Sequence, residues 1–204
     1  MRRRPVILAL SSLAVLVLAA GCGAGGDQNA QSERAFLSAM VPHHRSAIEM
    51  AEAAQGRLED PKIRKIKDAI IETQAAEIGQ MERIHQRLFD EPLEPDEGAH
   101  MQLGLSAQEA GMDHMGGATP VSKSPPPADR AFIAEMVPHH RGAVAMARAV
   151  LARTQDAELR KLAEEIVSAQ RREIATMEEV RERKYAGLVT EGVGSGERRR
   201  AGLS

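Results

Sequence analysis

The chain has 204 residues and a formal net charge of −2, a balance that gives no reason to expect binding to nucleic acids. Cys22 is the single cysteine, so the sequence excludes a disulfide framework. Any metal bound by the mature fold must therefore be held by His, Met, Asp or Glu side chains.

The first 21 residues have the pattern of a secretory signal peptide. Arg2–Arg4 form a basic start, Pro5–Ala20 are almost wholly apolar, and small residues precede Cys22. The apolar run is shorter than the ~20 residues that a membrane-spanning helix usually needs. Its end resembles a bacterial lipobox, which implies cleavage before Cys22, lipid on that residue and a protein anchored to the membrane outside the cytoplasm. Plain secretion is the alternative. Residues 22–31 are expected to form a flexible tether.

Two segments of the chain, residues 32–89 and 129–185, are copies of one another. The tract Met40–Arg45 recurs letter for letter as Met136–Arg141, 96 residues later, and the surrounding sequences align without a gap. This internal repeat predicts that the fold is built from two equivalent units.

Each copy has the apolar spacing of a helix, interrupted once. Asp60 and Pro61 fit an N-cap and a first helical position, and Asp156 keeps the cap in the second copy. Each copy is therefore predicted to be a helical hairpin, and the two hairpins to form an all-α four-helix bundle. The apolar spacing continues through Pro42 and Pro138, which favours helices kinked at proline over helices that begin there.

Residues 90–128 are predicted to be a long loop that links the copies, because they contain several prolines and glycines. The loop also carries a His/Met cluster whose residues are Met112, His114 and Met115. Residues 186–204, rich in glycine and ending near an arginine cluster, are expected to be a disordered tail.

The repeated tract places imidazoles beside thioethers, a combination that suits Cu(I) or another soft metal. At about 100° per residue, two histidines and two methionines of each copy share one face of a helix. The candidate ligands are Met40, His43, His44 and Met50, and Met136, His139, His140 and Met146. Secondary candidates are Met81, His85, Met177 and the loop residues Met112, His114 and Met115. Whether the copies build two sites or share one is left open.

Three other interpretations compete with a soft-metal site. Methionines often fill gaps in helical cores, and a histidine on an apolar face is often structural. A di-iron enzyme would need a Glu-x-x-His motif on two helices, but Glu82 and His85 have no complete counterpart, because Arg181 stands where the second histidine should be. A scaffold that docks a protein partner without metal is the third. No catalytic constellation is visible, so a non-enzyme is expected.

The residues around the histidine pairs resemble the domain-of-unknown-function 305 family. The matching pattern is Phe36-x-x-x-Met40-Val41-Pro42-His43-His44-x-x-Ala47-Ile48-x-Met50-Ala51, with its second copy. The resemblance covers Glu33 to about Arg183, apart from the linker. It implies a ferritin-like helical bundle outside the cytoplasm, and it suggests copper as the metal, for buffering, resistance or delivery. A protein partner and the oligomeric state are left open.

Overall fold

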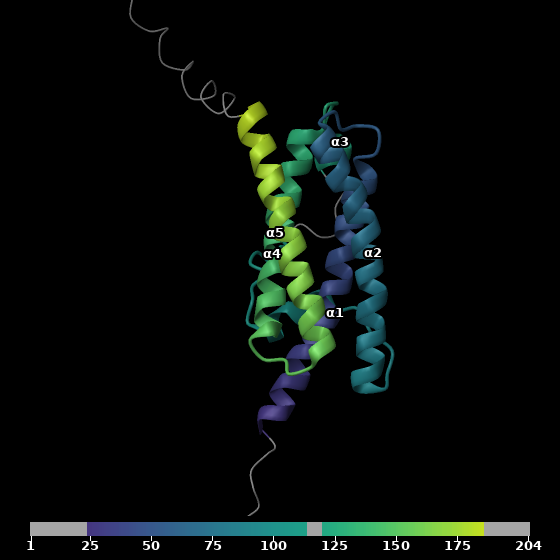
Figure 1. Ribbon diagram of the computed structural model, residues 1–204, viewed down its shortest axis with the longest axis vertical. Helices are drawn as coiled ribbons and strands as arrows, with labels where there is room; N and C mark the ends of the chain where they lie inside the picture. Colours follow the sequence, from purple (N-terminus) through teal and green to yellow (C-terminus); the bar gives the residue numbers. More distant parts are fainter. Residues whose placement is uncertain (1–23, 114–119, 186–204) are drawn as a thin grey trace, which may run out of the picture.

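The computed structural model describes residues 24–113 and 120–185, and every regular element within them is helical. Four long helices run side by side along the molecule, and a short helix, α3, lies near one end (Figure 1). The elements are α1 (Ala24–Ala53), α2 (Pro61–Phe89), the 3-10 helix η1 (Glu97–Leu103), α3 (Pro120–Lys123), α4 (Asp129–Leu151) and α5 (Ala157–Tyr185). The predicted all-α bundle of two helical hairpins is confirmed. None of the described helices is both long and apolar enough to cross a membrane.

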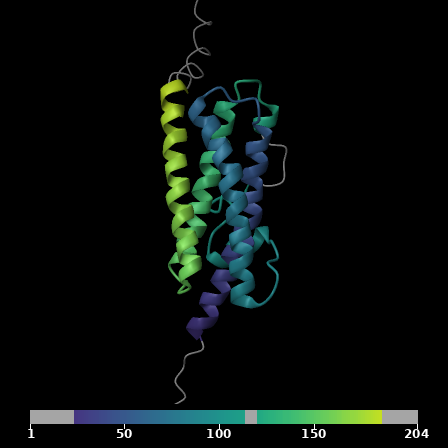
Figure 2. The same ribbon diagram turned by 45° about the vertical axis from the view of Figure 1, so that its right-hand side comes forward.

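The two hairpins pack face to face. α1 contacts α2 within the first hairpin and α4 of the second, and α5 contacts both α4 and α2. Turning the molecule shows the same arrangement from a second side, with α5 at the edge of the bundle (Figure 2). The core between the helices consists of two apolar clusters, one toward each end of the bundle.

The helix boundaries follow the capping residues that the sequence contains. The side chain of Asp60 accepts a hydrogen bond from the backbone N–H of Lys62 at 2.8 Å, and Pro61 is the first residue of α2. Asp156 caps α5 in the same way, accepting from the N–H of Leu159 at 2.9 Å. Pro42 lies inside α1 and the equivalent proline lies inside α4, so both helices continue through proline.

Two segments differ from their predicted structure. Residues 24–31 were assigned to a flexible tether, but they form the first turns of α1. Ser32 is buried and its Oγ donates to the carbonyl of Gln28 at 2.9 Å, and extending an existing helix is easier than starting one. The predicted loop 90–128 contains η1 and α3. η1 begins at Glu97, after the N-cap residue Asp96, whose side chain accepts a hydrogen bond from the N–H of Gly98. The signal peptide, Cys22, His114, Met115 and the tail lie outside the described residues.

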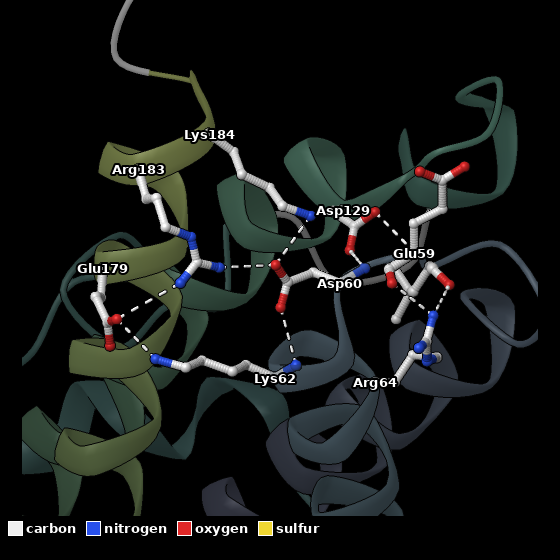
Figure 3. Close-up of polar contacts among 9 residues, drawn as sticks. Glu59, Asp60, Lys62, Arg64, Asp129, Glu179, Arg183 and Lys184 are labelled. Carbon is white, nitrogen blue, oxygen red and sulfur yellow. Dashed lines mark hydrogen bonds and ion pairs between the residues drawn. The ribbon is translucent and has the colours of Figure 1, made fainter.

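Ion pairs fasten the turn of the first hairpin to the end of the second (Figure 3). The carboxylate of Asp60 lies 2.9 Å from both Arg183 and Lys184, at the end of α5. Asp129, at the start of α4, accepts hydrogen bonds from the backbone N–H groups of Glu59 and Asp60 at 3.0 and 2.8 Å. These contacts make the α1–α2 turn part of the interface between the repeats.

The same arrangement recurs at the other end of the bundle with the repeats exchanged. Arg87, near the end of α2, forms two hydrogen bonds to the Asp156 carboxylate at 2.7 and 2.9 Å and a third to Glu158 at 3.0 Å. Thr154 donates to Glu33 of α1 at 2.6 Å. Each repeat therefore binds the helix-capping turn of the other, which fixes α1 against α4.

Candidate metal centre

The two histidine pairs lie together in the core, where α1 packs on α4. His43, His44 and His140 are fully buried and His139 is 6% exposed. The rings of His43 and His139 are 3.7 Å apart between centroids, at an interplanar angle of 34°. Within each pair the centroids are 6.3 and 6.4 Å apart. The four rings therefore form one continuous group, to which each repeat contributes two.

This group separates the two apolar clusters of the core. Along α1, the buried residues up to Val41 belong to one cluster and those from Ala47 to the other. Along α4 the order is reversed: residues up to Val137 belong to the second cluster and those from Ala143 to the first. The histidines thus occupy a polar layer at mid-height, crossed by two antiparallel helices.

A glutamate on the neighbouring helix orients the second histidine of each pair. Nε2 of His44 lies 2.8 Å from Oε2 of Glu77 on α2, and Nε2 of His140 lies 2.8 Å from Oε2 of Glu173 on α5. A carboxylate only accepts hydrogen bonds, so Nε2 carries a proton in each ring, and in the neutral imidazole the lone pair is then on Nδ1. A carboxylate that fixes the tautomer in this way is the usual second partner of a metal-binding histidine.

The other nitrogens of these rings have no partner. Nε2 of His43 donates to the backbone carbonyl of His139 at 3.1 Å, which leaves its Nδ1 free. Nδ1 of His44, Nδ1 of His140 and both ring nitrogens of His139 are also buried without a hydrogen bond. Leaving such an atom unpaired costs about 1–3 kcal/mol, so several in one place make this layer a candidate binding site.

Burial keeps the rings of His43 and His139 neutral; these two stacked rings are the inner rings of the layer. Desolvation lowers the pKa of His43 and of His139 well below the ordinary histidine value, and the neighbouring histidines lower it further. A neutral imidazole is the form that binds metal. The inner rings are therefore ready to donate a lone pair over the physiological pH range.

Sequence reasoning missed four residues of the polar layer. Glu77 and Glu173, the hydrogen-bond partners of His44 and His140, were not among the candidate residues. Gln74 and Gln170, one turn earlier, are 2% and 3% exposed, and polar atoms of both side chains lack a partner. A usable signal was present, because polar residues recur in both copies at positions that the helical period assigns to the core.

Each apolar cluster contains methionines from both repeats. One apolar cluster contains Met40, Met81, Met112 and Met146, and the other contains Met50, Met136 and Met177. Met40 and Met50, expected to share one site with the intervening histidines, are thus divided between clusters. Ten residues of helix extend about 15 Å, too far for both sulfurs to reach one ion. The antiparallel crossing of α1 and α4 brings Met146 into the cluster of Met40, and Met50 into that of Met136.

Among the described secondary candidates, His85 has its own hydrogen-bond and ring contacts. Nδ1 of His85 is 3.0 Å from the carbonyl of Glu91, and its ring packs on Phe89. Nδ1 of His100 is likewise 2.8 Å from the carbonyl of Leu105. Met81, Met112 and Met177 are buried in the apolar clusters.

Within residues 24–113 and 120–185, no three His, Cys, Asp or Glu side chains are grouped as metal ligands. The donors that the polar layer does offer are free Nδ1 atoms in a core that also contains thioethers. Those donors suit a soft ion of low coordination number.

Part of the linker covers the layer on the α4 side. Gly142 of α4 lies so close to the linker that a Cβ on this glycine would be 2.1 Å from the carbonyl oxygen of Ala110. Gly111 has φ +67°, and a Cβ on it would lie 2.9 Å from the carbonyl oxygen of His139. Two glycines therefore let the linker backbone rest directly on α4 beside the inner histidine. The first copy has Ser46 in place of Gly142.

Comparisons with known proteins agree with this architecture. The sequence matches the family model described as "Domain of unknown function (DUF305)" over residues 32–181. No curated protein matches the chain. A solved DUF305 fragment from Deinococcus radiodurans is 33% identical, with a TM-score of 0.61 over 74% of this chain and 96% of that chain.

Solved structures of a protein named CopM are also similar. Its apo form is 31% identical, with a TM-score of 0.61, and the alignment covers 75% of this chain and 98% of that chain. Its Cu(I)-bound form is 30% identical, with a TM-score of 0.58 and coverage of 75% and 97%. CopM has also been solved in Cu(II)-bound and Ag-bound forms.

Proposed function

The chain belongs to the domain-of-unknown-function 305 family, and from this premise we propose that it binds copper, preferentially Cu(I), in the polar layer of its core. Similarity to CopM, solved with Cu(I), Cu(II) and Ag bound, supports copper as the metal. Silver and Cu(I) share a preference for soft donors and low coordination numbers.

One observation carries the proposal: four buried imidazoles, two of them held by glutamate, present nitrogen atoms that nothing in the described chain satisfies. A structural histidine uses its ring nitrogens in hydrogen bonds, as His85 and His100 do at Nδ1. The layer histidines instead keep an unpaired lone pair at Nδ1, and binding a metal ion would remove the cost of burying it.

The ligands are proposed to come from both repeats. The histidines are His43, His44, His139 and His140. Met40 lies one turn before His44, and Met136 one turn before His140, so these thioethers are the nearest along each helix; Met146 and Met50 join them from the opposite repeat. Because the inner rings stack on each other, one histidine centre shared by the repeats is favoured over two separate sites. An ion in it would take thioethers from one apolar cluster only, either Met40 and Met146 or Met50 and Met136.

The proposed setting is outside the cytoplasm, on a lipid anchor at Cys22. The basic and apolar leader and the small residues before this cysteine support it. In that setting the protein would buffer copper, confer resistance or deliver the ion. The proposed role is binding without turnover.

A competition titration tests the copper proposal. Purified protein lacking the signal peptide is titrated with Cu(I) against a chromophoric chelator, and with Ag(I) and Zn(II). His44→Gln/His140→Gln should weaken Cu(I) and Ag(I) binding at least tenfold, whereas the matched pair His85→Gln/His100→Gln should leave it unchanged. Absence of binding by the unmodified protein would favour the scaffold interpretation, and iron uptake with an oxygen-dependent absorbance band would favour a di-iron enzyme.

A further inference from the structure

An open groove of about 440 Å³ lies between α4 and α5 on the outside of the bundle. Its lining residues form facing pairs along the two antiparallel helices. The residues on α4 are Arg141, Val144, Ala145 and Arg148, and those on α5 are Arg171, Ile174, Ala175 and Glu178. The groove has apolar residues in the middle and charged residues at both ends.

The charges at the two ends differ in kind. At one end Arg141 and Glu178 form an ion pair of 2.5 Å, the contact expected between facing residues of neighbouring helices. About two turns further along, Arg148 of α4 and Arg171 of α5 both line the groove. In the described parts of the chain neither guanidinium has a carboxylate or hydrogen-bond partner. Two cations on adjacent helices repel each other unless an anion lies between them.

The first repeat provides an internal comparison, because the same backbone carries different residues there. Arg45 and Glu82 keep the ion-pair positions, but Glu52 and Ala75 stand where the second repeat has its two arginines. Glu49 also replaces Ala145. The helical hairpin does not require the two arginines for folding, since the equivalent hairpin of the first repeat lacks them. Of the two hairpins, the second alone has them.

We propose that the groove binds an organic oxyanion, a phosphate or carboxylate head carrying a short apolar chain. Arg148 and Arg171 hold the head group with their planar guanidinium groups, which match the geometry of both kinds of oxyanion. The chain lies along Val144 and Ile174, where it removes apolar surface from water. The volume is within the range of small-molecule sites. This site is independent of copper.

Calorimetric titration tests the proposal with four probes: hexyl phosphate, hexanoate, inorganic phosphate and hexanol. Hexyl phosphate or hexanoate should bind with a dissociation constant below about 1 mM, at least about tenfold tighter than inorganic phosphate or hexanol. The order of the two amphiphiles identifies the preferred head group. Inorganic phosphate binding as tightly as hexyl phosphate, or no binding by either amphiphile, contradicts the proposal.

Two variants locate the binding. Arg148→Gln/Arg171→Gln should weaken amphiphile binding at least tenfold, and Arg45→Gln/Arg83→Gln, which removes the same charge from the first repeat, should not. Arg171→Glu should abolish binding and raise the melting temperature, because it gives Arg148 a facing carboxylate. Unchanged amphiphile binding in the Arg148/Arg171 variant, or equal loss in the control, overturns the assignment.

Discussion

Oε2 of Glu77 lies 2.8 Å from Nε2 of His44, although the residues are 33 positions apart and lie on different helices. Glu173 and His140 repeat the relationship at the same distance in the second half of the chain. Because the carboxylate fixes the proton on Nε2, the Nδ1 atom of each ring is left with a lone pair inside the core. In the proposed copper site, these are the nitrogen atoms that would bind the metal ion.

Replacing both carboxylates by amides should weaken metal binding without unfolding the protein. In Glu77→Gln/Glu173→Gln the side chains keep their size but no longer hold the imidazole tautomer. We expect Cu(I) affinity to fall about 10–100-fold, the usual effect of losing a second partner of a metal-binding histidine. Chelator competition measures this, with Glu72→Gln/Glu182→Gln as an exposed control. Equal affinities for both double variants would show that the carboxylates do not orient ligands.

Replacing His139 by leucine should stabilise the metal-free protein. Both ring nitrogens of His139 are buried without partners, and the backbone carbonyl that accepts from His43 remains after the substitution. We expect the free energy of unfolding in urea to rise by about 1–3 kcal/mol, while Cu(I) binding weakens. His85→Leu, which breaks the hydrogen bond to Glu91, should destabilise instead. Destabilisation by His139→Leu to the same extent would contradict the interpretation of its nitrogens as unsatisfied.

Gly142→Ala should destabilise the fold by displacing the linker. Its Cβ would lie 2.1 Å from the Ala110 carbonyl oxygen and 2.4 Å from the Gly111 backbone nitrogen, and backbone cannot move aside as a flexible side chain can. The expected loss is about 1–3 kcal/mol by urea unfolding. Gly26→Ala is the matched control within α1, since its Cβ meets nothing within 4 Å and should be neutral or slightly stabilising. A neutral Gly142→Ala would place the linker away from α4.

Arg87→Gln should make stability less sensitive to acid. The hydrogen bonds from Arg87 hold the pKa of Asp156 below its ordinary value of about 4. A carboxyl whose folded pKa is lowered stabilises the protein above its unfolded pKa, and this contribution is lost as the pH falls through the folded value. The urea midpoints of Arg87→Gln and the unmodified protein should therefore differ most near pH 7 and converge below pH 4. A difference that stays constant from pH 7 to pH 3, or one equal to that of the exposed control Arg83→Gln, would exclude this linkage.

Local signals in the sequence predicted the helices well. The apolar period gave the hairpins, Asp60 and Pro61 gave the start of α2, and the repeated tract placed the histidines on helices that run through proline. Residues 24–31 were missed because glycine and asparagine usually indicate irregular chain, whereas here the helix extends outward from the packed residues near Ser32.

The composition of the site depended on how the hairpins pack. Spacing along one helix grouped Met40 with Met50, but the antiparallel crossing of α1 and α4 pairs each with a methionine of the other repeat. Glu77 approaches His44 only because α2 folds back on α1. A single-helix pattern contains no information on these contacts, although polar residues recurring at core positions in both copies would have indicated them.

The most direct test observes the histidine ring nitrogens while a soft metal binds. In protein labelled with nitrogen-15 at histidine, titration with Ag(I) should shift the Nδ1 resonances of His44 and His140, and both shifts should be complete at the same ratio of silver to protein. The Nε2 atoms of these rings should stay protonated, hydrogen-bonded to Glu77 and Glu173. Silver bound tightly with all four Nδ1 resonances of the layer unmoved would contradict the account.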